Sequence, residues 1–484
     1  MSTGTLFATL YLTHSMQRIA LNRENMQHQD NISSPPTSNN FVPRTRTTRQ
    51  SLLDNSLHGR ALETLHLIAE RMRDPALLFS TAARAREQIK LDRAFSWGRA
   101  SFNHLGSLAL LYLSLARSFP DEGWEESAHK YLRLAAQRSQ QTPLVTPGLY
   151  NGSSGLALVV AAFCQEEPRY RRTLEALNEQ ISRQVLDLSL PTAIAQSSMG
   201  TYDVINGAAG ILGYLCSLPE PPSHVQEAID VLIHYLIWLG GEEKPGHPNW
   251  LIAPEWLNEH DQALYPNGNY NLGLAHGIPG PLAALSLAWQ AGYHLPGQQE
   301  AIEHISSWIR ASAISDTWGI NWPGAIPYTA THPWEQEMLP TRAAWCYGAP
   351  GIAASLRLAG EALGDEELCQ MAVTSLETVY RRPAEAIGLI SPIVCHGIAG
   401  LVAIGLRFAQ VSSSQMIRDH IPLQVAQILA ACHPDAPLIV RDQEIPGNFV
   451  DDPSFLTGAV GVALVLLAAS SEVEPAWDRI LMIA

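Results

Sequence analysis

The stretch from Ser391 to Gly400 reads SPIVCHGIAG, and its last four residues carry the spacing Gly-x-x-Gly just before an apolar run. The same spacing recurs before other apolar runs. The first glycines of the six copies are Gly152, Gly207, Gly277, Gly348, Gly397 and Gly458. Gly106, with Ala109 in the second place, is a degenerate seventh copy. Repetition at intervals of 46 to 71 residues predicts a repeat architecture with loop insertions.

The segments after the glycine pairs are apolar nearly all round, which predicts buried helices. We place these inside: 107–117, 156–163, 211–218, 281–291, 352–363, 401–409 and 462–470. Amphipathic segments lie between them and are placed outside, among them 128–138, 174–188, 225–239, 301–313 and 371–381. Seven alternating pairs close most simply into an all-α fold, an α/α toroid of seven inner and seven outer helices.

The two ends of this pattern suggest the domain boundaries. Residues 24–50 are rich in Asn, Gln, Ser, Thr and Pro, so we expect 1–50 to form a flexible N-terminal arm and 51–484 a single catalytic domain. Within that domain, 240–271 and 316–341 interrupt the helices with Pro, Gly and Trp. We expect rim loops or small β insertions there, with a hairpin turn at Asn267 and Gly268.

Composition excludes several classes of function. The chain has 46 acidic and 31 basic residues, a net charge of −15 and no basic cluster, which argues against a nucleic-acid partner. Its six cysteines lack the density of a secreted disulfide framework, which indicates a reducing, cytosolic compartment. The longest apolar run, Val460 to Ala469, is too short for a membrane helix. Residues 5–12 do not have the flanks of a signal peptide.

The residues just before the glycine pairs are candidates for a site. In a toroid the N-termini of all inner helices point to one end, so these residues would line a shared mouth. They are Tyr150, Asn151, Asp203, Asn206, His276, Cys346, Tyr347, Cys395, His396 and Thr457. The set is rich in metal ligands and titratable groups.

Cys346, Cys395 and His396 form a candidate zinc site. Two thiolates and one imidazole would leave the fourth tetrahedral position open, as a catalytic zinc requires. Zinc could there bind a substrate thiol and stabilise its thiolate at neutral pH. The alternative is that each cysteine is a small core residue, since free cysteine is commonly buried.

His276 and Asp203 occupy the corresponding places in the two preceding repeats. His276 could remove a thiol proton or protonate an enolate, with Asp203 orienting the imidazole or favouring its charged form. A structural histidine and a helix-capping aspartate remain equally open. Arg342 and Tyr347 flank Cys346 and could stabilise enolate oxygen, although Arg342 could equally be an ion-pair partner.

Tryptophans near the predicted rim could form an apolar wall for a peptide, although core packing is the commoner use. They are Trp250, Trp256, Trp318, Trp322 and Trp345. Four further cysteines lie away from the mouth and are interpreted as packing residues: Cys164, Cys216, Cys369 and Cys432.

Five stretches together resemble the lanthionine synthetase C family. They are YDVINGAAG from Tyr202, YPNGNYNLGLAHGIPG from Tyr265, RAAWCYGAPG from Arg342, SPIVCHGIAG from Ser391 and FLTGAVG from Phe455. The resemblance runs from about residue 50 onward, and the paired WCYG and CHG elements are its specific part. It implies an α/α toroid with one Zn²⁺ per chain held by Cys346, Cys395 and His396. It also implies functional roles for the residues at 203, 276, 342 and 347.

The resemblance further implies a stand-alone bacterial cyclase. Such an enzyme adds cysteine thiols across dehydroalanine or dehydrobutyrine in a dehydrated precursor peptide that carries a leader, and so closes (methyl)lanthionine rings. The chain has no room for a dehydratase, so we expect a separate dehydratase as partner, together with a membrane exporter. The expected location is the cytoplasm, peripheral to the membrane where such a complex forms.

Three alternatives are weighed against this reading. A relative in the same superfamily would add glutathione or another small thiol to dehydrated residues, and Asp203 within YDVINGAAG argues against it. A non-catalytic peptide-binding toroid with structural zinc would need neither His276 nor Asp203. A prenyltransferase-like toroid would use an Asp, Cys, His ligand set whose spacing is absent here.

Overall fold

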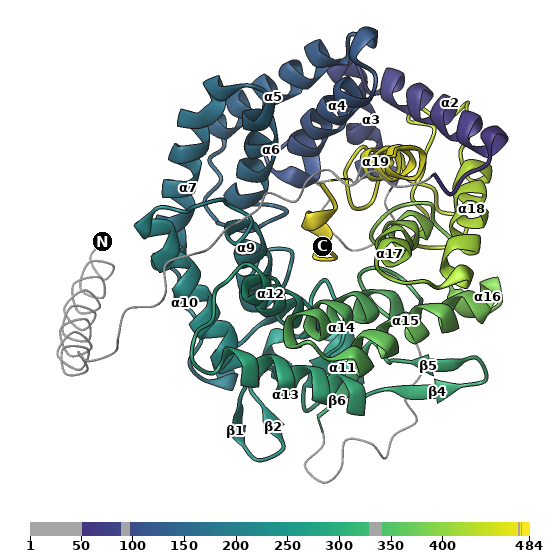
Figure 1. Ribbon diagram of the computed structural model, residues 1–484. Helices are drawn as coiled ribbons and strands as arrows, with labels where there is room; N and C mark the ends of the chain where they lie inside the picture. The colour runs from purple at the N-terminus through teal and green to yellow at the C-terminus, as the bar shows by residue number, and fades with distance from the viewer. Residues whose placement is uncertain (1–50, 89–96, 329–340, 473–474, 476) are drawn as a thin grey trace. The chain divides into compact units, whose positions relative to one another are not determined.

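Seven apolar helices form the inner layer of a ring in the computed structural model, which describes residues 51–88, 97–328, 341–472, 475 and 477–484 (Figure 1). They are α4 (Ser107–Ser118), α6 (Ser153–Glu166), α9 (Ala208–Leu215), α12 (Pro279–Gln290), α14 (Ala349–Leu363), α17 (Ile398–Val411) and α19 (Ala459–Ser470). Every residue of α19 is buried, which explains why this helix is apolar all round. The predicted inner layer is confirmed. The predicted arm, 1–50, lies outside the described residues.

The outer layer consists of amphipathic helices. They are α2 (Asn55–Arg71), α5 (Trp124–Gln141), α7 (Arg171–Leu186), α10 (Ser223–Leu239), α13 (Gln298–Ala311), α15 (Glu366–Arg381) and α18 (Gln415–Ala430). Each packs on the inner helix that precedes it in the chain, except α2, which packs on α19. Because α19 also contacts α4, the first and last repeats meet and the ring closes. The described residues therefore confirm the α/α toroid with seven helices in each layer.

The second glycine of each pair allows the close approach of neighbouring repeats. A Cβ at Gly400 would lie 2.0 Å from the carbonyl oxygen of Val394 and 3.1 Å from Cβ of Trp345 in the repeat before it. At Gly351 the corresponding distances are 2.3 Å to the oxygen of Trp345 and 2.9 Å to Cβ of Leu274. Real side chains do not approach backbone atoms so closely, so the spacing reflects steric need.

A circle of main-chain hydrogen bonds joins the turns before the inner helices. Each turn donates an N–H to the carbonyl of the next turn around the ring. The bonds run from Asn103 to Tyr150, Tyr150 to Ile205, Val204 to Ala275, Ala275 to Cys346, Cys346 to Cys395, Cys395 to Leu456 and Phe455 back to Asn103. The circle satisfies backbone groups that burial would otherwise leave unpaired, and it fixes the turns at one end of the toroid.

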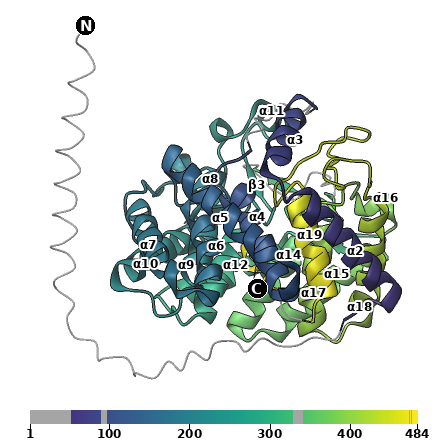
Figure 2. The same ribbon diagram turned by 90° about the horizontal axis from the view of Figure 1, so that it is seen from above.

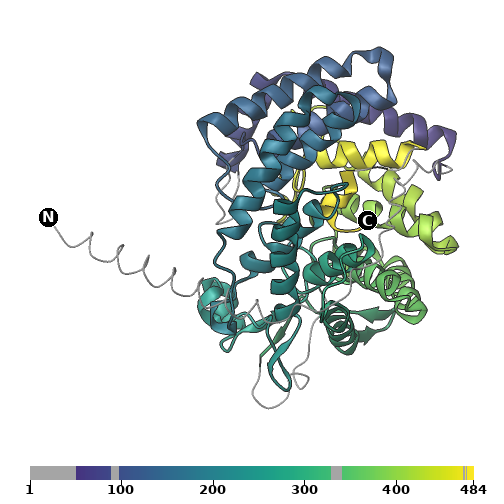
Figure 3. The same cartoon turned by 60° about the vertical axis from the view of Figure 1, so that its left-hand side comes forward.

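Three small antiparallel sheets fall in or beside the two predicted insertions. They pair β1 (Glu242–Lys244) with β2 (His247–Pro248), β3 (Asn269–Asn271) with β6 (Ala325–Pro327), and β4 (Ile314–Asp316) with β5 (Gly319–Asn321). The strands gather on the side of the ring that holds α13 (Figures 1 and 3). The described residues thus confirm the expected β insertions.

The predicted hairpin at Asn267 and Gly268 is wrong. Gly268 does lie in a turn, with φ +91° and its N–H donating to Tyr265. However, the strand that follows, β3, pairs with the distant β6, and its first residue Asn269 also bridges to Ile252. The turn therefore redirects the chain without joining two adjacent strands.

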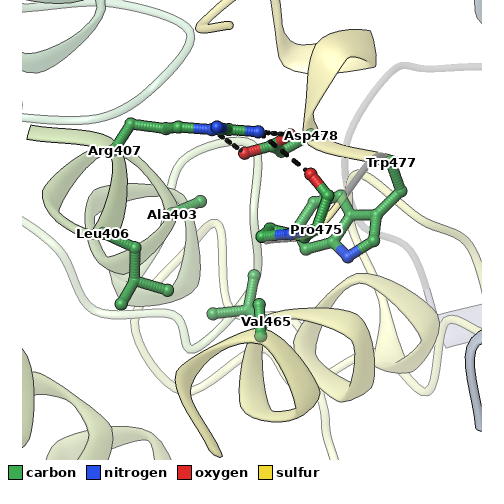
Figure 4. A pocket seen from close by; sticks show the side chains of 8 residues that line it. Ala403, Leu406, Arg407, Val465, Pro475, Trp477 and Asp478 are labelled. Carbon is green, nitrogen blue, oxygen red and sulfur yellow. Dashed lines mark hydrogen bonds and ion pairs between the residues drawn. The ribbon is translucent and has the colours of Figure 1, made fainter. Parts of the chain in front are cut away.

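The segment Trp477–Ile483 lies at the centre of the ring (Figure 1). Its carbonyls accept hydrogen bonds from three side chains around it: Tyr150 Oη to Ile480 at 2.7 Å, Trp345 Nε1 to Leu481 at 2.8 Å and Arg357 Nη2 to Ile483 at 2.6 Å. Asp478 pairs with Arg407 of α17 in a small apolar pocket (Figure 4). No helix in the part of the chain that the structure describes is long and apolar enough to cross a membrane.

Candidate functional site

The circle of hydrogen bonds brings the predicted site residues together at one end of the toroid. α3 (Pro75–Gln88) and α11 (Glu259–Leu264) project from one end of the ring (Figure 2). The ring of His104, just before α4, lies 6.3 Å from that of Trp97, which in turn contacts Phe79 of α3. α3 therefore covers the end at which the inner helices begin.

Cys346 and Cys395 form a thiol pair. The N–H of Cys346 donates to the carbonyl of Cys395 at 3.2 Å, and the two side chains are hydrogen-bonded to each other. The hydrogen bond from Cys395 lowers the pKa of Cys346 to about 7; burial opposes this, and the charges of His396 and Arg342 assist it. The pKa of Cys395 is raised instead, because its proton is shared with Cys346. The pair thus offers one thiolate readily at neutral pH.

His396 is buried next to this pair and is held by two carboxylates. Its Nε2 lies 2.9 Å from Oε2 of Glu444 and 3.2 Å from Oδ1 of Asp442. Burial alone would lower the pKa of His396, but the hydrogen bonds and charges of the two carboxylates raise it to about 9. Because Nε2 is engaged, Nδ1 is the ring nitrogen that remains for another partner.

Two candidate donor sets include His396. One is the set predicted from the sequence, the thiols of Cys346 and Cys395 with the imidazole, for which the described residues show no cluster of the three ligand atoms within 4.8 Å. The other consists of His396, Asp442 and Glu444, whose ligand atoms lie within 4.8 Å of one another. We favour the first set for a metal, because Oε1 of Glu444 is already bonded to the guanidinium of Arg342 at 2.9 Å. A fixed positive charge there disfavours a second cation, whereas two sulfurs and one nitrogen suit zinc.

A further cluster on the outside of the ring is already satisfied internally. Glu125, His129 and Glu167 are grouped closely enough to hold a cation. However, Nε2 of His129 pairs with Glu167 at 2.7 Å and its Nδ1 is bonded to Tyr170 Oη at 2.8 Å. We read this cluster as a link between α5 and the turn before α7.

His276 and Asp203 are in direct contact, as the sequence predicted they could be. Nδ1 of His276 lies 2.7 Å from Oδ2 of Asp203, and Oδ1 of Asp203 accepts the N–H groups of Asn206 and Gly207 at 2.8 Å each. Burial tends to lower the pKa of His276, but Asp203 and Cys346 raise it above its ordinary value of 6.5. Asp203 therefore both caps its turn and holds the imidazole, while the proton-transfer role of the pair stays a prediction.

Arg342 and Tyr347 flank the thiols from the same turn. Arg342 forms an ion pair with Glu444, as the second of its two predicted uses requires. Its positive charge also acts to lower the pKa values of both cysteines. The hydroxyl of Tyr347 accepts a hydrogen bond from Nδ2 of Asn271 at 3.0 Å. Burial raises the pKa of Tyr347 to about 12, so the phenol keeps its proton at neutral pH and can donate it.

The remaining predicted residues are mostly structural. Trp250, Trp322 and Trp345 are fully buried, which confirms core packing for these three. Trp318 is partly buried, and Trp256 is 47% exposed with Nε1 bonded to the carbonyl of Ala195. The four cysteines away from the mouth are free thiols whose pKa values burial raises, as expected for packing residues: Cys164, Cys216, Cys369 and Cys432.

Asp442, Glu444 and Asn271 were not predicted from the sequence. Asp442 and Glu444 lie in the connection between α18 and α19, where no repeated motif marks them. Asn271 lies within a quoted stretch, but an asparagine before a helix has many structural uses. Only their contacts with His396, Arg342 and Tyr347 place them at the site.

Comparison with known proteins gives consistent matches. The sequence model of a family described as Lanthionine synthetase C-like protein matches residues 105–482. The nisin biosynthesis protein NisC of Lactococcus lactis subsp. lactis is 24% identical over 313 residues, which cover 64% of this chain and 74% of that protein. A solved structure described as nisin cyclase has a TM-score of 0.69 and 23% identity, covering 84% of this chain and 96% of its own. The structural likeness supports the same toroidal fold.

Proposed function

The chain belongs to the lanthionine synthetase C-like family, and from this premise we propose that it is a zinc-dependent lanthipeptide cyclase. Its substrate is a precursor peptide in which serine and threonine residues have already been dehydrated. The product carries lanthionine or methyllanthionine rings.

One observation carries the proposal. A hydrogen-bonded thiol pair, the buried Cys346 and the half-buried Cys395, adjoins His396 at the same end of the toroid as the bonded pair of His276 and Asp203. Soft metal ligands and an oriented imidazole near each other are the elements that thiol activation and proton transfer require. The other four cysteines lie elsewhere as packing residues.

The first three residues would hold one zinc ion: Cys346, Cys395 and His396. Bound there, zinc would lower the pKa of a substrate cysteine so that its thiolate is present at neutral pH. The low pKa of Cys346 means that this donor is easily deprotonated. Three protein ligands leave one tetrahedral position for the substrate sulfur.

The reaction is an addition in which no atom is lost. The cysteine sulfur forms a bond to Cβ of the dehydroamino acid, the C=C π bond breaks, and the proton lost from sulfur is balanced by one gained at Cα. We propose that His276 moves one of these protons, because Asp203 holds its Nδ1 and Nε2 then remains for the substrate. We propose that Arg342 and the hydroxyl of Tyr347 stabilise the negative charge that develops on the carbonyl oxygen.

The wider setting follows from this chemistry. We propose two partners, a separate dehydratase that acts first and a membrane exporter. We therefore propose a cytoplasmic enzyme that contacts the membrane only through a complex with these partners. We propose the arm 1–50 and the cyclase domain 51–484 as its two parts, and we expect no nucleic-acid partner because the chain is acidic.

The experiment compares wild type with Cys395→Ala and with Cys432→Ala. We expect about one zinc per chain in wild type and in Cys432→Ala, and little in Cys395→Ala, because loss of one ligand in three removes most of the affinity. Each protein is then incubated with a dehydrated precursor peptide, and free thiols are counted by alkylation and mass spectrometry. We expect thiol loss with wild type and Cys432→Ala only.

Other outcomes separate the alternatives. Consumption of glutathione without loss of peptide thiols would replace the cyclase with a small-thiol transferase. Zinc binding without consumption of any thiol would favour a peptide-binding toroid. A folded wild-type protein that binds no zinc would contradict the proposed metal centre.

A further inference from the structure

Glu444 links two residues of the proposed site from opposite sides of its carboxylate. Its Oε2 lies 2.9 Å from Nε2 of His396, and its Oε1 lies 2.9 Å from Nη2 of Arg342. His396 precedes α17 and Arg342 precedes α14, whereas Glu444 comes from the connection before α19. One side chain therefore ties together the approaches to three inner helices.

The backbone around Glu444 is itself fixed. Asp442 and Val450 exchange two main-chain hydrogen bonds of 2.9 Å, which close the intervening residues into a loop. Asp442 is buried and bonds both Nε2 of His396 at 3.2 Å and Oγ of Ser391 at 3.0 Å. The position of Glu444 is thus set by a bridged loop whose base also contacts His396.

This arrangement has two consequences for a metal at Cys346 and Cys395. A histidine that binds a metal through one nitrogen is usually oriented by a hydrogen bond from the other, and carboxylates serve this purpose. In addition, Arg342 stands four residues before Cys346, and its guanidinium is held by Glu444 at 2.9 Å. Without a carboxylate partner it would be free to pair with a thiolate and compete with the metal.

We propose that Glu444, assisted by Asp442, is a positioning residue of the metal centre. It holds His396 by Nε2, so that Nδ1 is the nitrogen presented to the metal, and it holds Arg342 so that its charge does not occupy the thiolates. This inference rests on the proposed function, since it concerns the same site. It adds two residues that neither the motifs nor the family resemblance assigned.

The test measures zinc affinity by competition with a chromophoric chelator, with Zn²⁺ as the only ligand. We expect Glu444→Gln to bind zinc about 10- to 100-fold more weakly than wild type, because only one end of the amide accepts a hydrogen bond and its NH₂ end would face the other donor. Glu377→Gln is the matched control. Glu377 also divides its oxygens between an arginine, Arg381, and a second donor, Ser414, and is 22% exposed against 25% for Glu444, but it lies on α15 in the outer layer. We expect its zinc affinity to equal that of wild type.

A second measurement does not depend on any variant. In the zinc-loaded wild-type protein, the ¹⁵N shifts of His396 should report a metal on Nδ1 and a proton on Nε2. A metal on Nε2 would overturn the inference, as would unchanged affinity in a folded Glu444→Gln protein. Either result, obtained with a wild-type protein that binds zinc and closes rings, would leave the proposed function intact. A wild-type protein without zinc would remove both.

Discussion

At the scale of single residues, Asp203 illustrates how one carboxylate serves both the fold and the chemistry. One oxygen accepts two main-chain N–H groups of its own turn, and the other holds Nδ1 of His276. The charge and hydrogen bond of Asp203 keep the pKa of His276 above 6.5 although burial acts in the opposite direction. The protonated form of His276 is therefore favoured by its neighbour.

Asp203→Asn should slow ring formation by about 10²-fold or more at neutral pH, because the imidazole loses its orientation and charge partner. The limb of the pH–rate profile that belongs to His276 should move to lower pH, whether the histidine acts as acid or base, since its pKa falls. The measurement is the rate of peptide thiol loss from pH 5 to 9. Asp365→Asn, which removes a carboxylate that caps α15 through Leu368, should leave the profile in place.

The direction in which the stability loss of Asp203→Asn changes with pH also follows from the pKa of His276. Because the pKa of His276 is raised in the folded protein, the pair contributes stability that is complete below about pH 6.5 and is lost as the pH rises through the folded value. The stability difference between wild type and Asp203→Asn should thus be larger at pH 6 than at pH 9. An equal difference at both values would mean that only the capping contact of Asp203 matters.

The predicted site residues all adjoin a repeated motif, whereas Asp442 and Glu444, which contact His396, do not. Cys346, Cys395, His396 and His276 stand one or two places before a glycine pair, so the shared direction of the inner helices was enough to bring them together. Glu444 adjoins no glycine pair, and a charged residue in a long connection is usually solvated, so nothing in the sequence marks it as a site residue. Its contact with His396 depends on how the loop folds back, which no local pattern encodes.

At the scale of elements, the glycine pairs are a packing requirement. Gly400→Ala should lower the free energy of unfolding by about 3 kcal/mol, because the new Cβ would meet the carbonyl of Val394 at 2.0 Å and either the helix or the turn must shift. Thermal and denaturant unfolding measure the effect.

Gly59→Ala is the matched control in α2. A Cβ at Gly59 would meet nothing within 4 Å, and the helix favours alanine over glycine, so this variant should gain about 0.5–1 kcal/mol. A loss at Gly59, or no loss at Gly400, would show that close approach of the repeats is not what the second glycine provides.

Elements differed in how far their sequence determined them. The inner and outer helices were predictable because burial on all sides and burial on one side leave different periodicities. The prediction located the turn at Gly268 correctly but was wrong about the strands it connects. The strand that pairs with β3 is β6, which lies beyond α12 and α13 in the chain. Strands of three residues carry too little periodicity to specify a partner so far along the chain.

At the scale of the whole molecule, closure of the ring depends on contacts between distant parts of the chain. α2 packs on α19, and the circle of main-chain bonds returns from Phe455 to Asn103. The segment Trp477–Ile483 adds links from the centre to the turns before α6 and α14 and to α14 and α17. The repeats are therefore joined both around the ring and through its middle.

The buried pair of Arg407 and Asp478 tests the importance of this central segment. Both carboxylate oxygens of Asp478 contact the guanidinium, and the two side chains are only 8% and 3% exposed. Asp478→Asn should cost about 3–5 kcal/mol, because it leaves a buried positive charge without its counter-ion. The exposed Asp419→Asn should change stability by less than about 0.5 kcal/mol.

Replacing both partners, with Arg407→Met and Asp478→Leu together, should recover most of the loss, since the apolar pocket then contains no charge. If the double variant were as unstable as Asp478→Asn, the segment would stabilise the ring through the exact shape of its packing, and the ion pair would be secondary.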